Sequence, residues 1–399
     1  MPARPSSLRI VVTGIVGSVP VGGVAWDYFQ YPIGLARLGH DVVYHEDTGN
    51  WPYDPLQVTA VNTASYSVDF LTRFFQAYAP ELSDRWHYRH LGVDSFGMSQ
   101  AKFDEFARSA DVFLDVSGAA RRPLALHPRC VAVFLDTDPG VNQIQLNAPG
   151  PRDDQWAESV KRFERYDRFV TYAENIGRAD CLVPLLGKSW ITTRMPIVRS
   201  LWSDVPPAMG GEPWTTVMTW NNFSAPLVHE GKEYGSKGVE FAKFSSLPQK
   251  TSRKLKIAVG GNEAPREKLI GDGWAVVDAP MMTLTPGDYR AFIAASRGEF
   301  STAKNVYVAM RTGWFSCRTA CYLAAGRPAV VQDTGFSKTV PVGQGLLAFD
   351  TLEQASAAIE TVERDYRLHA EAARELAADQ FGSDKVLTRL LDDIFSKGG

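Results

Sequence analysis

The chain has 399 residues, of which 45% are hydrophobic and 22% are charged, and its formal net charge is −3. This length predicts two domains, and the composition is typical of a folded globular protein rather than a disordered chain. The small net charge gives no overall reason to expect a nucleic-acid partner, and no apolar run reaches the roughly 18 residues that would span a bilayer.

The first half alternates strand patterns with helical patterns. Apolar runs predict strands over residues 8–14, 41–45, 111–116, 131–135 and 168–172. Apolar residues at helical spacing predict helices over residues 28–38, 67–78, 99–109 and 154–166. Such alternation is typical of a parallel sheet with helices on both faces.

Prolines and glycines interrupt residues 195–213, and a second alternating series follows. Strands are predicted over 215–220, 256–259, 274–277 and 329–331, with helices over 316–326 and through the tail, 352–397. We therefore expect the α/β class, with two doubly wound, Rossmann-like domains at 1–200 and 201–382. In such sheets ligands bind beyond the carboxyl ends of the strands, so a cleft between the two domains is the expected site.

The segment from Arg297 to Phe336 carries the most information about function. Its helix is predicted to begin near Ser316, which can cap it, and the unpaired N–H groups there favour an anion such as a pyrophosphate. Gly313 would let the backbone approach the phosphates, and Arg318 would add a charged donor. Beyond the next strand come polar residues suited to sugar hydroxyls, Gln332, Asp333 and Thr334.

This segment resembles the donor half of GT-B glycosyltransferases of the bacterial group-1 type. The stretch Ala-Ala-Gly-Arg-Pro-Ala-Val-Val, over 324–331, is similar to the turn and strand that precede the sugar contacts in that family. The resemblance covers the second half well and the first half only in layout. It implies a donor site in the second domain, which includes Trp314 and Phe315, and a C-terminal helix, 383–399, that crosses back to the first domain.

The chain departs from that family at one place. Many retaining members carry a Glu-x7-Glu pair where this chain has Trp314 to Tyr322, without the glutamates. An inverting outcome is therefore favoured, and Glu299 is the nearest acidic candidate for a donor contact. The resemblance also implies a basic residue that neutralises the departing diphosphate, for which Lys237 is the candidate.

A glycine-rich loop, 14–23, follows the first strand but does not match the dinucleotide fingerprint Gly-x-Gly-x-x-Gly. In a GT-B protein this loop would line the acceptor side of the cleft, with Gly22, Gly23 and Trp26 beside the acceptor. An inverting transferase needs a general base there. The candidates are Asp27 and Asp138, with Asp136, His45 and Glu46 behind them.

Asp136 and Asp138 also form the Asp-x-Asp pattern with which GT-A transferases hold a divalent cation. The two-domain layout and the helix segment argue against that fold, so we expect no obligatory metal or cofactor. The seven histidines show no spacing typical of zinc sites.

The sequence therefore predicts the transfer of a hexosyl or deoxyhexosyl group from a nucleoside diphosphate sugar to a hydroxyl of a small molecule or glycan. The alternatives are a sugar-nucleotide epimerase on the same fold and a non-catalytic nucleotide-sugar-binding protein, while the broken fingerprint disfavours an oxidoreductase. The sequence leaves open whether the chain forms a homodimer.

The cysteines and the N-terminus bear on the compartment. No Cys-x-x-Cys pair and no signal-peptide pattern occur in the sequence. We therefore expect a cytoplasmic protein with reduced, mostly structural cysteines.

Overall fold

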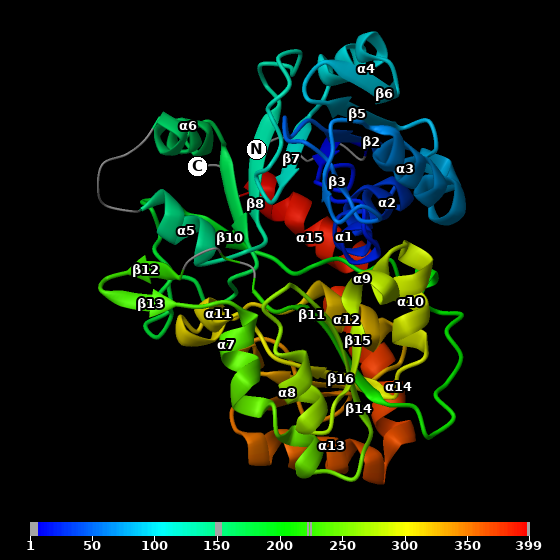
Figure 1. Cartoon of the computed structure of the whole chain (residues 1–399). Coiled ribbons are helices and arrows are strands. Elements are labelled where there is room, and N and C mark those ends of the chain that lie inside the picture. The colour runs from blue at the N-terminus through cyan, green and yellow to red at the C-terminus, as the bar shows by residue number, and fades with distance from the viewer. Residues whose placement is uncertain (1–6, 148–153, 222, 224–225, 397–399) are drawn as a thin grey trace.

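Two sheets, one in each half of the chain, form the framework of the computed structural model (Figure 1), which describes residues 7–147, 154–221, 223 and 226–396. Neighbouring strands are parallel in both sheets, except that the last strand of the first sheet runs antiparallel to its neighbour. The α/β class and the two Rossmann-like sheets that the sequence predicts are confirmed. The first sheet has the order β10 (Trp190–Thr192), β9 (Arg168–Thr171), β8 (Val131–Asp136), β7 (Val112–Val116), β1 (Arg9–Thr13), β2 (Asp41–Glu46), β5 (Trp86–His90), β6 (Asp94–Gly97).

Helices cover both faces of the first sheet. Side chains alternate between the faces along β2: Tyr44 packs against Phe29 and the helices α1 to α3, whereas Val43 joins the core beneath α4. The predicted helix over 28–38 is two helices that start earlier. Pro32 has no N–H to give to the carbonyl of Tyr28, where α1 ends. The helices are α1 (Gly22–Tyr28), α2 (Gln30–Arg37), α3 (Ser65–Tyr78), α4 (Gln100–Ala107), α5 (Val141–Leu146) and α6 (Asp154–Phe163).

The second sheet repeats this plan with six strands in the described residues. Its order is β15 (Ala275–Asp278), β14 (Leu255–Gly260), β11 (Trp214–Thr219), β16 (Gly298–Ser301), β17 (Ala329–Gln332), β18 (Leu346–Phe349). The sequence pattern missed β16 because Glu299 stands inside it. The helices are α7 (Lys237–Phe241), α8 (Arg266–Gly271), α9 (Ala279–Thr283), α10 (Pro286–Ala294), α11 (Asn305–Ala309), α12 (Cys317–Ala324), α13 (Leu352–Arg364) and α14 (Tyr366–Leu376).

The last helix, α15 (Ser383–Ser396), returns to the first half and packs on α2 (Figure 1). Gly34 of α2 has no room for a Cβ because Leu387 lies against it, and Arg168 donates to the carbonyl of Ile394 at 2.9 Å. The largest apolar core therefore runs from the first sheet to α10, α12 and α15 without a break. Residues 397–399 of the predicted helix, and 1–6 of the first predicted domain, lie outside the described residues.

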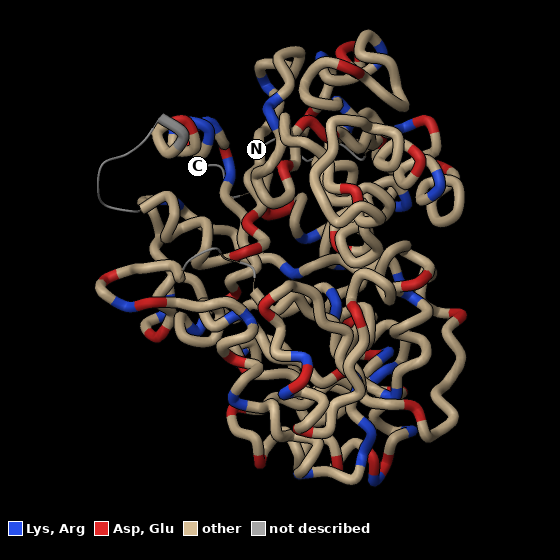
Figure 2. Tube along the Cα trace, in the orientation of Figure 1, with Lys and Arg blue, Asp and Glu red and all other residues tan. Residues whose placement is uncertain are grey.

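Two short hairpins, β3 (Tyr53–Asp54) with β4 (Thr59–Ala60) and β12 (Leu227–His229) with β13 (Lys232–Tyr234), complete the described strands. Figure 2 shows basic and acidic positions interspersed along both halves, in keeping with the small net charge. Within the described part of the chain, no helix combines the length and the apolar character that a membrane span needs.

Candidate functional site

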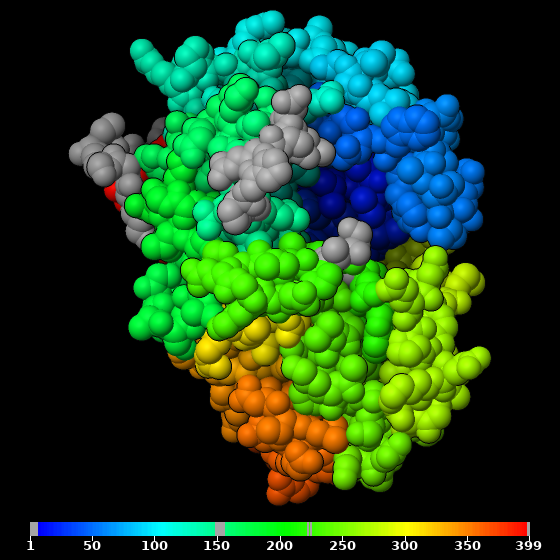
Figure 3. Space-filling view, turned by 60° about the vertical axis from the view of Figure 1, so that its left-hand side comes forward, coloured from blue at the N-terminus to red at the C-terminus, as the bar shows by residue number. Residues whose placement is uncertain are grey.

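The two halves enclose a hollow, which Figure 3 shows with N-terminal residues at its base. The carboxyl ends of the strands in each sheet lead toward the boundary between the two halves, which we call the seam. Three segments meet there: the loop after β8, the helix α11, and the start of α12. Lys304 donates to Asp138 Oδ1 at 2.5 Å, and the Tyr307 hydroxyl donates to the same oxygen. The Trp314 indole donates to the carbonyl of Thr137 at 3.0 Å. Asp138, a candidate base, is therefore bound by side chains of the second half.

Asp27 lies across the seam from the start of α12. It is partly buried on α1, and the Cys317 thiol donates to its carboxylate. The pKa of Asp27 is raised to about 6, chiefly by burial; the Cys317 thiol and the charge of Lys304 oppose the rise, and the charge of Asp138 adds to it. The structure thus brings the two candidate bases, Asp27 and Asp138, to one place beside α12.

Lys237 is the first residue of α7 and is only 9% exposed. Within the described residues, no group accepts a hydrogen bond from its ammonium. Burial holds its pKa well below the usual value, and the charges of Arg318 and Lys304 lower it further, while Glu299 acts in the opposite direction. An anion placed beside Lys237 would favour its charged form, which burial otherwise disfavours, so the position suits a negatively charged group.

Arg318, by contrast, is paired with groups of the second half. Its guanidinium donates to Glu299 Oε1 at 2.5 Å, to the Val217 carbonyl at 2.5 Å, and to the hydroxyl of Ser301. Glu299 is fully buried. The pair ties α12 to β16 and β11, and neither charge points to an open surface as the sequence had suggested for a donor contact.

The polar residues at and after the end of β17 also form hydrogen bonds within the protein. The Gln332 amide donates to Glu240 at 2.6 Å, and the Thr334 hydroxyl donates to the Trp314 carbonyl at 2.6 Å. Asp333 accepts from the Ser337 hydroxyl at 2.6 Å and caps the turn that follows. These side chains shape the carboxyl edge of the second sheet, and Gln332 and Thr334 are buried there.

Gly313 makes room for the first half of the protein. Its φ is +77°, and a Cβ there would lie 2.9 Å from the backbone nitrogen of Asn175. Asn175 is fully buried, and its amide donates to the carbonyls of Arg311 at 3.1 Å and Gly335 at 3.0 Å. Because Gly313 has no side chain, Asn175 can pack against it. The sequence gave no signal for Asn175, because its partners lie more than a hundred positions away.

The remaining donor candidates have mixed surroundings. Ser316 stands at the N-cap of α12, but its hydroxyl makes no capping bond. Phe315 is 4% exposed and stacks on Phe381, so its ring belongs to the core. Trp314 is partly exposed and packs on Tyr307, with ring centres 4.4 Å apart.

The residues expected on the acceptor side pack against the second half instead. A Cβ on Gly22 would lie 2.2 Å from the carbonyl oxygen of Thr285, and Gly23 lies against Tyr289. Trp26 is 1% exposed, and its indole donates to the carbonyl of Pro286 at 2.8 Å. These positions join α1 to α10, and burial leaves the Trp26 ring no contact with the cleft.

Glu46 fixes the glycine-rich loop that lines the hollow. Its buried carboxylate accepts from the backbone N–H groups of Gly17 at 2.7 Å and Ser18 at 2.6 Å, and from the hydroxyls of Ser18 and Tyr44 at 2.7 Å. The sequence offered Glu46 only as a weak candidate base. Its signal was its place at the end of a buried strand, where side chains meet the loops of the cleft.

Asp136 has a structural place as well. Its fully buried carboxylate accepts from Asn142 and Gln143 at 2.7 Å and from Thr171 at 2.9 Å. The Asp-x-Asp pattern therefore does not present two free carboxylates. Across residues 7–147, 154–221, 223 and 226–396, no three His, Cys, Asp or Glu side chains gather in a way that suits a metal ion.

Comparisons with known proteins give the same fold. The chain is similar to AviGT4, a glycosyltransferase involved in avilamycin A biosynthesis, at 13% identity and a TM-score of 0.53, over 97% of both chains. Sucrose-phosphate synthase from Thermosynechococcus elongatus matches at 13% identity and a TM-score of 0.54, over 98% of this chain and 100% of that chain. Anabaena HepE, solved in complex with UDP-glucose, matches at 13% identity and a TM-score of 0.53, over 98% and 100%.

No protein-family model matches the chain, and no curated protein matches it at a significant level. The structural matches cover nearly the whole of each chain. The chain therefore has the GT-B fold, in which two Rossmann-like domains face each other across a cleft, and this confirms the resemblance that the sequence segment at 297–336 had indicated.

Proposed function

We propose that the protein is a glycosyltransferase that moves a sugar from a nucleoside diphosphate sugar to a hydroxyl of a small molecule or glycan. The observation that carries the proposal is Lys237: a largely buried lysine whose amine has no hydrogen-bond partner among the described residues, at the carboxyl edge of the second sheet. A diphosphate supplies the anion that such a cation favours. The full-length likeness to HepE, whose structure holds UDP-glucose, supports a nucleotide sugar as the donor.

In this proposal the diphosphate lies between Lys237 and the start of α12. The N–H groups there have no helical partners and carry partial positive charge. Lys237 lies close to Cys317 and Arg318 at this helix start. Lys304 lies close to Asp27, which faces the same helix start. These charges stabilise the diphosphate as it leaves, which is where negative charge develops in the reaction. We propose that these side-chain charges take the part that a divalent cation plays at a departing diphosphate, so that the reaction is metal-independent.

Asp27 is the proposed general base. Asp138 is held by Lys304 and Tyr307, whereas among the described residues Asp27 has the Cys317 thiol as its hydrogen-bond partner and no ion pair. With a pKa of about 6, Asp27 is ionised at neutral pH and still basic enough to take a proton. The acceptor oxygen bonds to the anomeric carbon, the bond to the diphosphate breaks, and the hydroxyl proton passes to Asp27. A single displacement of this kind inverts the anomeric configuration.

We propose the corresponding division of the chain. Residues 1–200 bind the acceptor, residues 201–382 bind a hexosyl or deoxyhexosyl donor, and the segment from 383 onward returns to the first domain. The contacts of α15 with α2 support this division. We further propose that the protein works in the cytoplasm, since its cysteines are unpaired.

A nucleotide panel tests the donor site. Binding to the native state raises the melting temperature, so we expect UDP, TDP, GDP or ADP to raise it in the parent protein and not in Lys237→Met. A panel without any response would contradict the donor site. A response retained in Lys237→Met would remove Lys237 from it.

A transfer assay tests the reaction and its stereochemistry. The preferred nucleoside diphosphate sugar is incubated with a panel of hydroxyl acceptors, and the anomeric configuration of the product is read by NMR coupling constants. An inverted product, formed with EDTA present, is expected. A retained configuration would refute the role of Asp27, and an epimerised donor without acceptor would favour the epimerase.

A further inference from the structure

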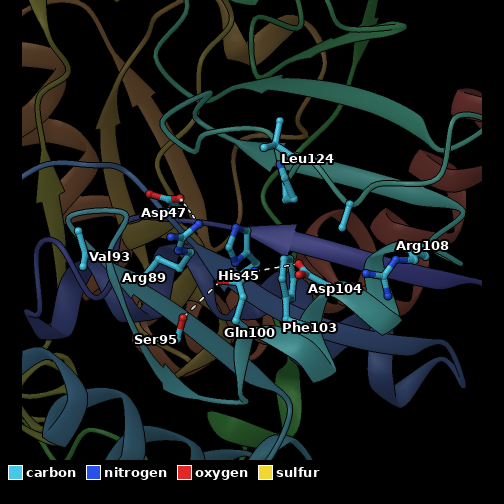
Figure 4. A pocket seen from close by; sticks show the side chains of 12 residues that line it. His45, Asp47, Arg89, Val93, Ser95, Gln100, Phe103, Asp104, Arg108 and Leu124 are labelled. Carbon is cyan, nitrogen blue, oxygen red and sulfur yellow. Dashed lines mark hydrogen bonds and ion pairs between the residues drawn. The ribbon is translucent and has the colours of Figure 1, made fainter.

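A second cavity lies in the first half, between α4, the ends of β2 and β5, and the loop at 123–125 (Figure 4). Its volume is about 510 Å³, within the range of small-molecule sites. It lies on the α4 face of the first sheet. Glu46 points from β2 to the glycine-rich loop of the cleft, and His45, one residue earlier, points to the opposite face and into this cavity.

Two adjacent polar side chains of this cavity, Asp47 and Arg89, each hold one buried atom without a hydrogen-bond partner among the described residues, although another nitrogen of Arg89 donates to the Gly92 carbonyl. Asp47 is 7% exposed, and its Oδ1 is buried with no donor among the described residues. The nearest cations, on Arg121 and Arg89, are 3.8 and 3.9 Å from its carboxylate, which is beyond hydrogen-bond length. Nε of Arg89 is likewise buried without an acceptor. Figure 4 shows Asp47 and Arg89 side by side beyond the end of β2.

His45 adds a hydrogen-bond donor. Its Nδ1 lies 3.1 Å from Nδ1 of His87, and burial lowers the pKa of both rings, that of His87 to about 4, so both are neutral at neutral pH. One Nδ1 must donate and the other accept. If His45 donated, the His87 proton would lie on Nε2, which is buried with no acceptor among the described residues. Since buried N–H groups without acceptors are rare, His87 donates, and His45 carries its proton on Nε2.

The charges on the cavity wall balance. Two arginines and two aspartates line it, namely Arg89, Arg108, Asp47 and Asp104. A nucleotide or another polyanion would meet as many negative groups as positive ones. A neutral molecule that offers donors and acceptors on adjacent atoms would satisfy Asp47, Arg89 and His45 together, and a sugar ring with neighbouring hydroxyls is such a molecule.

We propose that this cavity binds a neutral saccharide ring. Resting on the proposed function, the ring belongs to the acceptor, so that the acceptor is a glycan or glycoside whose far sugar lies here. The short path between the two places supports this: Asp47 follows directly on Glu46, which holds the loop of the cleft through Gly17 and Ser18. A chain of sugars that passes over the end of β2 would join the cavity to the cleft.

Saturation-transfer NMR tests the proposal with methyl glucoside, methyl galactoside, methyl mannoside, maltose and lactose as probes. At least one probe should bind to the parent protein. Ser95→Phe places a ring in the cavity from the edge strand β6, where aromatic residues are tolerated, and should abolish the signal. Asp47→Asn removes the charged acceptor and should weaken binding about tenfold. Thermal melting of both variants shows that they fold.

The outcomes separate this inference from the proposed function. Absence of binding by every saccharide, or binding unchanged in Ser95→Phe, would overturn the cavity site, as would preferential binding of L-glutamate, which we include as a charged probe. Lys237→Met should bind the saccharide as the parent does, while Ser95→Phe should keep its melting response to nucleoside diphosphates. If the parent protein binds a saccharide but shows no melting response to nucleoside diphosphates, the proposed function fails and the saccharide site is retained.

Discussion

The starts of α12 and α7 each carry a buried basic side chain, and the surroundings of the two differ. Arg318 donates to Glu299, to Ser301 and to the Val217 carbonyl, so its charge is neutralised within the second half. Lys237 has no such partner among the described residues, and burial depresses its pKa. A paired buried cation holds elements together, whereas an unpaired one is costly to the fold and is retained where a ligand carries the opposite charge.

The comparison predicts that the largest effect on stability comes from the paired cation. Arg318→Ala leaves the carboxylate of Glu299 buried without its partner, which costs about 3–5 kcal/mol of unfolding free energy. Urea denaturation measures this loss.

The double variant Arg318→Met with Glu299→Leu is the matched control. It removes both charges together. Its loss of unfolding free energy should be smaller than the sum of the losses in Arg318→Met and Glu299→Leu, since the effects of residues in contact are not additive. If Arg318→Ala melts like the parent while nucleotide binding disappears, Arg318 contacts the donor and the contrast with Lys237 is lost.

Lys237 predicts the opposite pattern. Lys237→Met replaces a largely buried amine that has no hydrogen-bond partner among the described residues, and should leave the unfolding free energy equal or raised. Its transfer rate should fall about 100-fold, as when one preorganised donor to a developing charge is removed. Steady-state kinetics with the preferred donor measures the loss. Lys250→Met, which changes an exposed lysine, is the control. Full activity of Lys237→Met would show that Lys237 does not act on the donor diphosphate.

The sequence predicted the elements better than it predicted the surroundings of their side chains. The start of α12 and the strand after Pro328 follow from local signals: an N-cap residue, glycine and an apolar run. The partners of Arg318 and Gly313 do not, because Glu299 lies 19 positions from Arg318 and Asn175 lies more than a hundred from Gly313. Charged and aromatic residues near a predicted site are therefore easily taken for ligand contacts when tertiary packing has already engaged them.

Asn175 extends the comparison to the seam between the halves. Asn175→Ala removes two hydrogen bonds and leaves the carbonyl of Arg311 without a donor, while the Lys338 N–H still donates to that of Gly335; the loss costs about 1–3 kcal/mol. The loop before α12 should loosen, so the dissociation constant of the nucleoside diphosphate should rise. Calorimetry of UDP binding and thermal melting measure the two effects. Asn50→Ala, on an exposed residue, should change neither. A stability loss with unchanged nucleotide affinity would make Asn175 part of the seam alone.

The smallest effect is a pH profile of the transfer rate. It concerns the two candidate bases, of which Asp138 is ion-paired with Lys304, while Asp27 has no ion pair in the part of the chain that the structure describes. Burial raises the pKa of Asp27 from 3.8 to about 6. A general base acts only when ionised, so the transfer rate should be level above pH 7 and fall about tenfold per unit below pH 6. Asp27→Asn should lose most of the rate and this inflection, whereas Asp138→Asn should keep the inflection. Because burial also raises the pKa of Asp115 and Asp136 to about 6, circular dichroism at each pH must show that the protein stays folded. If it does and the inflection survives in Asp27→Asn, another group is the base, and the unpaired carboxylate has a structural role.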